Sequence, residues 1–224
     1  MSTGVALILD FGGVISRTLF ETHELTERTL GLSPGSLTWQ GPFAPESDDL
    51  WMAMQNDEIS EREYWVQRTS EVGRMLGEHW TEMSQFVMAA RGADPESVVR
   101  PQAVHAIDTA KARGVKLAIL SNELDLFYGP EFRDNLPLLQ NFDVIADATY
   151  TKILKPDARA YLACAKELDV DPHSCVFVDD QARNVQGAKA VGMNAVHFDV
   201  RQPGRSFQQA LALLLDLPKE LEHA

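Results

Sequence analysis

The sequence predicts an α/β protein: a doubly wound parallel sheet with a small helical insertion after its first strand. Five short apolar runs alternate with stretches of helical spacing, and a long segment without a strand-like run separates the first run from the second. Apolar runs without polar alternation are typical of strands that are buried on both faces of a parallel sheet. The alternation of such strands with helices indicates that helices cover this sheet.

The predicted strands differ in how clearly the sequence marks them. Val5–Leu9 and Cys175–Val178 are apolar throughout. The other three contain a polar residue or are brief, and they run over Val115–Leu120, Val144–Ala146 and Ala195–Phe198. We expect all of these runs to lie in one sheet.

The segments between these runs have the marks of helices. Pro101 suits a first helical position, because its missing N–H is not needed there, and Gly114 follows the last turn as a stop. Apolar residues recur at helical spacing in 161–168 and again in 181–191. Each of these helices connects two consecutive predicted strands.

Residues 16–97 interrupt this rhythm and are expected to form a helical insertion, a cap, which leaves 1–15 and 98–224 as the core domain. Ser60 and Glu63 form a capping box, in which the serine hydroxyl accepts from the Glu63 N–H while the glutamate reaches back. All tryptophans of the chain lie in this segment: Trp39, Trp51, Trp65 and Trp80. We expect them to form a small core of the insertion; the alternative is that one of them lines a substrate cavity.

Composition places the chain among soluble globular proteins. Of its 224 residues, 45% are apolar and 24% are charged, which is close to the average of that class. Its 20 basic and 33 acidic residues give a net charge of −13. Because this charge repels phosphate backbones and anionic lipid surfaces, we expect neither nucleic acid nor a membrane as a partner.

Further features indicate a cytoplasmic protein. No apolar run approaches the ~20 residues of a membrane helix, and the first residues carry neither a basic region nor a cleavage site, so they do not read as a signal peptide. Cys164 and Cys175 are the only cysteines, and their spacing matches no zinc or redox template. We expect two buried thiols in a reducing compartment and leave the oligomeric state open.

Polar side chains follow three of the predicted strands. Asp10 comes directly after the first strand, Ser121 and Asn122 end the second, and Asp179 and Asp180 follow the fourth. In open α/β sheets ligands bind beyond the carboxyl ends of the strands, so these groups are expected to converge although they lie far apart in the sequence. A single polar turn would be ordinary, but three at one edge indicate a site.

A cluster of carboxylates at this edge repels itself unless a positive charge compensates it. Asp10 and Asp180 offer oxygen ligands of the kind that hold Mg²⁺, which typically binds one or two carboxylates together with substrate phosphate and water. Lys155, in a later strand-to-helix connection, can neutralise the remaining charge. Gly12 and Gly13 let the backbone turn sharply and direct its N–H groups toward an anion. This combination points to phosphoryl chemistry on a small molecule.

Four short motifs occur in order along the chain. They stand as Leu9-Asp10-Phe11-Gly12-Gly13-Val14, Ile119-Leu120-Ser121-Asn122, Lys155-Pro156-Asp157 and Phe177-Val178-Asp179-Asp180, the last followed by Asn184. In order, spacing and strand context they resemble the motifs of the haloacid dehalogenase-like hydrolase superfamily, whose familiar cap is a helical insertion between the first two motifs. The branch that they most resemble contains the N-terminal phosphatase domain of mammalian soluble epoxide hydrolase and small bacterial sugar-phosphate phosphatases.

The resemblance implies a role for each motif. Asp10 is the expected nucleophile, which forms an aspartyl-phosphate, and Lys155 steadies its charge. Asp10, Asp180 and the backbone carbonyl of Gly12 are the expected Mg²⁺ ligands. Ser121 is expected to hydrogen-bond the phosphoryl oxygens. Phosphoryl transfer depends above all on positioning and charge neutralisation, which these groups would supply.

Two further groups of residues complete the implied site. The phosphoryl group of the substrate is expected to be bound at two strand ends, by Gly12, Gly13, Ser121 and Asn122. Asp179 and Asn184 are expected to support the metal site. The resemblance therefore implies a Mg²⁺-dependent phosphatase that acts on a small phosphorylated metabolite.

The sequence departs from the family pattern at Gly12, where related phosphatases usually carry a second aspartate that protonates the leaving oxygen and later activates water. General acid–base catalysis contributes about 10²–10⁴-fold. Without it we expect a slow phosphatase, one restricted to good leaving groups, or one that recruits another acid. The candidates are Glu123, Glu21 and His23, although their sequence context favours an ordinary surface role for each.

Two other functions stay open. In the dehalogenase branch of the superfamily the aspartate attacks carbon and expels halide without a metal, and Lys155 with Tyr161 resembles that branch. Against this, Gly12 replaces the tyrosine usual there, and the paired acids Asp179 and Asp180 replace a serine-rich motif. The other function is that of a binding or regulatory protein with weak catalytic activity, which the missing side chain at Gly12 suggests.

Overall fold

The computed structural model describes residues 4–91 and 95–217. The chain falls into two compact units. The core unit consists of Met1–Arg17, Val99–Leu124 and Leu136–Ala224, and the insertion unit consists of Thr18–Val98 and Asp125–Asn135. The insertion unit covers most of the segment expected to be a cap and adds Asp125–Asn135, which its sequence pattern did not single out. The role of the insertion as a cap, with boundaries at 16 and 97, stays a prediction.

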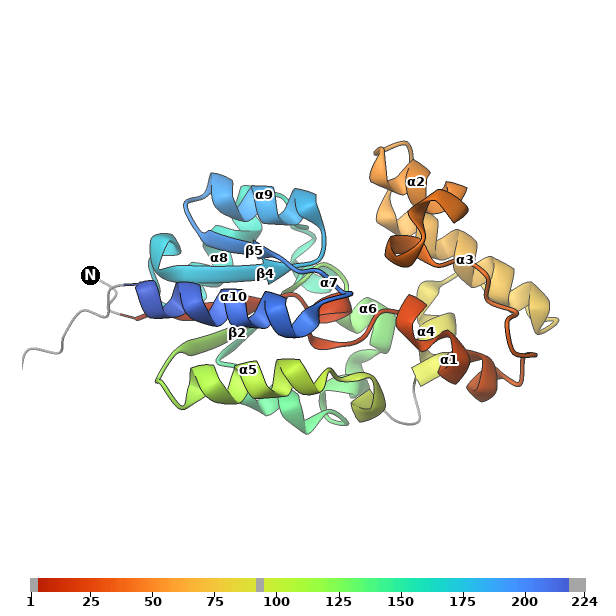
Figure 1. Ribbon diagram of the computed structural model, residues 1–224, viewed down its shortest axis with the longest axis horizontal. Coiled ribbons are helices and arrows are strands. Elements are labelled where there is room, and N and C mark those ends of the chain that lie inside the picture. Colours follow the sequence, from red (N-terminus) through yellow and green to blue (C-terminus); the bar gives the residue numbers. More distant parts are fainter. Residues whose placement is uncertain (1–3, 92–94, 218–224) are drawn as a thin grey trace, which may run out of the picture. The chain divides into compact units, whose positions relative to one another are not determined.

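The core unit contains a five-stranded sheet in which every neighbouring pair of strands is parallel (Figure 1). The strand order is β3-β2-β1-β4-β5. The strands span Ala6–Leu9 (β1), Lys116–Ser121 (β2), Val144–Asp147 (β3), Cys175–Asp179 (β4) and Asn194–His197 (β5). Each strand overlaps one of the predicted apolar runs, with ends that differ by about one residue, so the predicted doubly wound parallel sheet is confirmed.

β1 lies at the centre of the sheet and determines where the polar strand ends meet. All of its residues are buried, because β2 and β4 flank it and helices cover the sheet. Leu9 is paired with Ile119 of β2 and with Val178 of β4. The residues that follow these three positions therefore emerge at the same edge of the sheet.

Helices cover both faces of the sheet (Figure 1). α5 and α10 pack against each other on one face, and α8 and α9 pack against each other on the other. The helices of the core unit span Pro101–Lys111 (α5), Ala148–Thr151 (α7), Ala158–Glu167 (α8), Ala182–Ala190 (α9) and Pro203–Asp216 (α10). α5, α8 and α9 lie where the sequence predicts helices. One further short helix, α6, spans Leu124–Tyr128 and joins the core unit to the insertion unit.

Both cysteines are buried in the core unit, as their sequence context predicts. Cys164 lies on α8 and Cys175 on β4, and both belong to one apolar cluster between the sheet and the helices. Burial raises the pKa of each thiol to about 12. A thiol with such a pKa carries almost no thiolate at neutral pH and therefore serves as a small apolar side chain.

The insertion unit contains helices α1 (His23–Leu30), α2 (Asp49–Gln55), α3 (Glu61–Met75) and α4 (Met83–Arg91). The predicted capping box is present at the start of α3: Glu63 N–H donates to Ser60 Oγ at 3.2 Å, and Ser60 N–H donates to Glu63 Oε2 at 2.7 Å. The predicted aromatic core is confirmed as well, since Trp39, Trp51 and Trp65 are buried together and Trp80 packs against them partly exposed.

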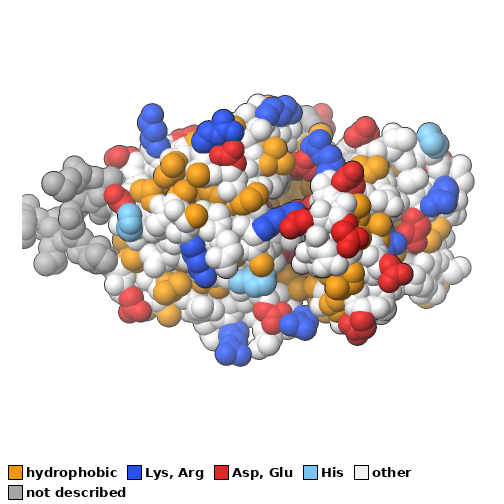
Figure 2. All heavy atoms as spheres, turned by 90° about the horizontal axis from the view of Figure 1, so that it is seen from above, with side chains coloured by type: hydrophobic (Ala, Val, Ile, Leu, Met, Phe, Trp, Pro, Cys, Tyr) orange, Lys and Arg blue, Asp and Glu red, His pale blue; other side chains and the backbone are white. Residues whose placement is uncertain are grey.

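Two observations concern possible partners. In the part of the chain that the structure describes, no helix combines the length and the apolar character that crossing a membrane requires. On the face of the molecule drawn in Figure 2, Lys and Arg side chains lie interspersed with Asp and Glu. The expectation that nucleic acid is not a partner stays a prediction.

Candidate active site

A glycine turn follows β1 and carries Asp10 at its start. The turn spans Phe11–Ile15 and is closed by the Ser16 N–H, which donates to the Phe11 carbonyl at 2.9 Å. Gly13 has a φ of 76°, and a Cβ there would collide with the carboxylate of Asp180. Gly13 is therefore required to be glycine, both for its backbone conformation and for the close approach of Asp180.

Gly12 is different from Gly13. Its φ and ψ are −67° and 129°, which any residue can adopt, and a Cβ built there meets no atom within 4 Å. The backbone of the turn does not demand a glycine at this position. The missing acid at Gly12 is therefore a property of the sequence that the local fold does not impose.

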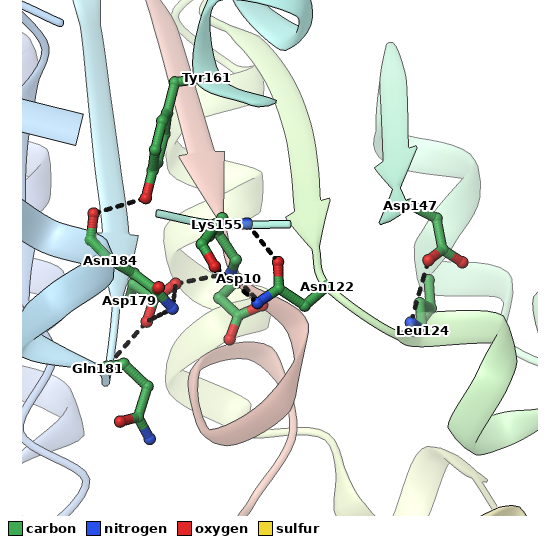
Figure 3. Close-up of polar contacts among 9 residues, drawn as sticks. All are labelled: Asp10, Asn122, Leu124, Asp147, Lys155, Tyr161, Asp179, Gln181 and Asn184. Atoms are coloured by element: carbon green, nitrogen blue, oxygen red, sulfur yellow. Dashed lines mark hydrogen bonds and ion pairs between the residues drawn. The ribbon is translucent and has the colours of Figure 1, made fainter. Parts of the chain in front are cut away.

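Asp10, Asp179 and Asp180 form a cluster at the end of β1 and β4, with one ligand oxygen from each lying within 4.8 Å of the others. Lys155 enters this cluster from the loop before α8 (Figure 3). Its Nζ lies 2.8 Å from Asp10 Oδ1 and 2.7 Å from Asp179 Oδ2. The side chains of Lys155 and Asp179 are only 2% and 0% exposed, whereas that of Asp10 is 14% exposed. One ammonium group thus contacts two of the three carboxyl groups of the cluster.

Asp179 is held by contacts that use both of its carboxylate oxygens. Asn184 Nδ2 donates to Oδ1 at 3.0 Å and to Oδ2 at 3.1 Å, and the Gln181 N–H donates to Oδ1 at 2.8 Å (Figure 3). The Tyr161 hydroxyl in turn donates to the Asn184 carbonyl at 2.8 Å. These contacts hold Asp179 in place between Lys155 and α9. Sequence reasoning found neither contact: that of Gln181 is a local one, two residues along the chain, and that of Tyr161 depends on how α8 and α9 meet.

Asn122 clamps the loop that carries Lys155. Its Oδ1 accepts from the Lys155 N–H at 2.6 Å, and its Nδ2 donates to the Lys155 carbonyl at 3.2 Å (Figure 3). The side-chain amide thereby joins the end of β2 to a loop that follows β3. The substrate-binding role expected for Asn122 stays a prediction. Ser121, the last residue of β2, is 7% exposed and lies on the strand next to β1; its expected role also stays a prediction.

The electrostatics of the cluster follow from burial and crowding. Burial raises the pKa of the Asp10 carboxyl. The charge of Lys155 lowers this pKa and the charge of Asp179 raises it, and the resulting pKa is about 7. For Lys155, burial disfavours the ammonium form, but Asp10 and Asp179 outweigh burial and raise its pKa above the usual range. Lys155 is therefore a permanent cation, while Asp10 is only partly ionised near neutral pH.

Asp10→Asn is expected to raise the melting temperature of the metal-free protein at about pH 8. Between the ordinary pKa of 3.8 and about 7, folded Asp10 holds a proton that the unfolded chain has released, so stability is lost as the pH rises through this range. A shift of about 3 units corresponds to about 4 kcal/mol at most. Asparagine stays neutral and avoids this loss. Thermal melting in EDTA should show an advantage of several °C at about pH 8 that vanishes near pH 4; an advantage independent of pH would contradict the raised pKa.

The donor set fits a hard divalent cation. The cluster offers carboxylate oxygens with an excess of negative charge, which is the environment that such a cation prefers. In addition, Asn184 Oδ1 is buried beside Asp179 and has no hydrogen-bond partner in the described protein. A buried acceptor without a partner is costly, and a cation-bound water would satisfy it.

The three candidates for a replacement acid lie in different surroundings. Glu123 is buried two residues after the end of β2. Glu21 accepts from the N–H and hydroxyl of Thr18, and His23 packs against Trp39 with ring centroids 4.4 Å apart, both within the insertion unit. Burial lowers the pKa of His23. A catalytic role for any of the three stays a prediction.

The acids and Lys155 lie at the carboxyl edge of the parallel sheet, which is where open α/β sheets bind their ligands. A family model described as haloacid dehalogenase-like hydrolase matches residues 6–192. The chain therefore belongs to the haloacid dehalogenase-like hydrolase family, as its four motifs predict.

Curated relatives match parts of the chain. Acyl-CoA dehydrogenase family member 10 of Mus musculus is 31% identical over 115 residues, which are 51% of this chain and 10% of that protein. Phosphatase MT3486 of Mycobacterium tuberculosis is 36% identical over 99 residues, or 44% of this chain and 46% of that protein. (S)-2-haloacid dehalogenase 1 of a Pseudomonas species is 34% identical over 127 residues, or 54% and 55%. The matches span about half of the last two relatives and far less of the first.

Solved structures share the fold over most of the chain. A haloacid dehalogenase superfamily hydrolase of subfamily IA from Geobacter sulfurreducens has a TM-score of 0.58 at 17% identity and covers 95% of this chain and 97% of its own. A family enzyme from Bacteroides thetaiotaomicron, solved in complex with magnesium and inorganic phosphate, has a TM-score of 0.50 at 14% identity and covers 88% and 95%. At these identities the likeness shows a common fold.

Proposed function

We propose that the protein is a Mg²⁺-dependent phosphatase that acts on a small phosphorylated metabolite through an aspartyl-phosphate on Asp10. The observation that carries this proposal is the position of Asp10 at the carboxyl edge of the sheet, held by Lys155 at 2.8 Å and placed beside two further carboxylates. A bound cation would compensate the repulsion between the paired acids Asp179 and Asp180 at this edge. The proposed location of the protein is the cytoplasm, and its oligomeric state stays open.

Each residue of the cluster has a part in the proposed reaction. A carboxylate oxygen of Asp10 bonds to phosphorus while the bond from phosphorus to the leaving oxygen breaks. Lys155 favours the ionised form of Asp10 against the burial that favours its neutral form. Water then hydrolyses the aspartyl-phosphate, which releases inorganic phosphate and restores Asp10. Because Gly12 offers no acid, the leaving oxygen takes its proton from water or from a replacement acid, for which Glu123, Glu21 and His23 are the candidates.

Asp10, Asp180 and the Gly12 carbonyl would hold Mg²⁺, which when bound supplies charge neutralisation for the phosphoryl oxygens. Lys155 and Asn184 hold Asp179 beside this position. The glycine turn presents backbone N–H groups next to Asp10, and the Ser121 hydroxyl is the proposed further donor to the phosphoryl group. The complex of the Bacteroides thetaiotaomicron enzyme with magnesium and inorganic phosphate, and the phosphatase name of the Mycobacterium tuberculosis relative, support this proposal.

A dehalogenase is the second candidate, and the 34% identity to (S)-2-haloacid dehalogenase 1 favours it. In that reaction Asp10 would attack carbon and expel halide, and no cation would be needed. The excess of carboxylates over Lys155 argues for the phosphatase, because a reaction without a cation gains nothing from Asp180 beside Asp10. A weakly catalytic binding protein is the third candidate, and the open position at Gly12 is its support.

One experiment separates these candidates. We expect turnover of p-nitrophenyl phosphate that requires Mg²⁺, stops in EDTA and is lost in Asp10→Asn. Halide release from 2-chloropropionate is measured on the same samples. Halide release that is lost in Asp10→Asn but persists in EDTA would show that the protein is a dehalogenase and would contradict the phosphatase proposal. Neither activity, in a protein that binds a phosphorylated metabolite, would favour the binding protein. Because Asp10→Asn is expected to be more stable at about pH 8, its loss of activity would not reflect unfolding.

A further inference from the structure

We propose that Arg100 is a positioning residue that fixes the glycine turn carrying Asp10. Arg100 lies at the start of α5, where the chain re-enters the core unit, far from Asp10 in the sequence. Its Nε and Nη2 both donate to the Gly13 carbonyl, at 3.1 and 2.9 Å. The residue is 2% exposed, so this contact is made away from water.

Arg100 is itself held by the core. Its N–H donates to the Ile15 carbonyl at 2.9 Å, and the neighbouring Val99 pairs with Ser16 in an antiparallel bridge. The guanidinium lies 5.5 Å from the centre of the Phe198 ring, beside the end of β5. The backbone and the side chain of Arg100 therefore contact the same turn, which makes Arg100 the link between the turn and α5.

The geometry of the contact explains why an arginine stands here. A guanidinium presents two N–H groups in a rigid fork, and bonds from a charged donor are stronger than neutral ones. The fork fixes the direction of the Gly13 carbonyl. Because a trans peptide is planar, the same contact fixes the Val14 N–H, which points the opposite way. A lysine could make only one such bond, from a flexible stem.

The turn that Arg100 fixes lies next to two side chains of the proposed site, those of Asp10 and Asp180. Asp10 precedes it directly, and the Asp180 carboxylate lies where a Cβ at Gly13 would stand. A rotation of the Gly13 peptide would therefore move the support of Asp180 and the backbone next to Asp10 together. Arg100 acts on the reaction only through this turn, so the inference rests on the proposed function for its kinetic consequences.

Three variants test this role. Arg100→Met removes the fork and keeps an apolar stem, Arg100→Lys keeps the charge but not the fork, and Arg100→Gln is a second neutral variant in case the first does not fold. Ile107→Ala is the matched control, because Ile107 is a fully buried residue of α5, and its truncation is expected to lower stability without removing the hydrogen bonds from Arg100 to the turn. All are measured well below their melting temperatures.

We expect kcat for p-nitrophenyl phosphate to fall about tenfold or more in Arg100→Met, with KM changed less than about twofold, since substrate contacts remain while the positioning of Asp10 is lost. Arg100→Lys should recover only part of kcat. Ile107→Ala should lower the melting temperature but keep the kcat of the wild type. Unchanged kcat in both neutral variants, or full recovery by lysine, would overturn the proposal.

A second readout is independent of activity. Hydrogen exchange of the amides in residues 11–16 should accelerate about 10- to 100-fold in Arg100→Met relative to the rest of the sheet, and not in Ile107→Ala. Unchanged exchange there would also overturn the proposal. If the wild-type protein itself shows no phosphatase activity, the proposed function fails, and the exchange measurement still decides whether Arg100 fixes the turn.

Discussion

Lys155→Met is expected to lower the free energy of unfolding by about 3–5 kcal/mol at about pH 8 and to reduce turnover about 10²–10³-fold. Both effects have one cause. Lys155 is the cation that contacts Asp10 and Asp179 at 2.8 and 2.7 Å, and the side chains of these two residues are 14% and 0% exposed. Removing one partner of a buried ion pair leaves an uncompensated charge, which costs far more than the pair itself contributes.

The loss of stability should depend on pH in a definite direction. Without Lys155, ionised Asp10 faces other carboxylates in a buried site, so its proton is held still more strongly than at the present pKa of about 7. The stability deficit of the variant therefore grows as the pH rises and shrinks as protonation removes the charge in acid. Chemical denaturation at about pH 5 and pH 8, in EDTA, measures this difference.

Lys166→Met is the control for Lys155→Met. Lys166 lies exposed on α8 and carries the same charge, so its replacement changes the net charge equally. We expect it to alter the free energy of unfolding by no more than about 0.5 kcal/mol and to leave turnover unchanged. Equal losses in the two variants would mean that the buried contacts of Lys155 contribute nothing specific.

Gly12→Asp is expected to accelerate the hydrolysis of alkyl phosphates by about 10²-fold, because a carboxyl placed there can protonate the leaving oxygen. The backbone at Gly12 accepts a side chain, with φ of −67°, and a Cβ meets no atom within 4 Å. Aryl phosphates leave without a proton, so their hydrolysis should change much less. The variant should thus narrow the gap in kcat/KM between p-nitrophenyl phosphate and an alkyl phosphate.

Gly12→Asn separates acid catalysis from simple filling of space. Asparagine has nearly the same shape as aspartate but has no acidic proton to give to the leaving oxygen. The hydrolysis of alkyl phosphates by Gly12→Asn should therefore be as slow as in the wild type. A gain of equal size in both variants, or none in either, would contradict the idea that an absent acid limits the reaction. The added carboxyl also increases repulsion in the metal-free cluster, so Gly12→Asp should melt below Gly12→Asn at about pH 8.

Local patterns in the sequence predicted many of the strands and helices of the fold. The apolar run before Asp10 and its counterpart before Asp179 are strands, and the capping box at Ser60 begins a helix as expected. The patterns succeed there because burial on both faces and the capping of free N–H groups are local requirements. The sequence pattern did not group Asp125–Asn135 with the insertion unit, because this grouping depends on contacts with residues distant in the sequence.

By itself, the sequence determined which strands carry polar ends, which acids and which lysine are available, and that Gly12 has no side chain to offer. Only the tertiary structure decided that Asn122 holds the backbone of Lys155. It also decided that Arg100, which follows the insertion in the sequence, donates to the turn after Asp10. The physical reason is that strand and helix signals arise between near neighbours in the chain. A hydrogen bond from a side chain to a distant carbonyl has no such signal, because any polar residue can make it once the sheet brings the two together.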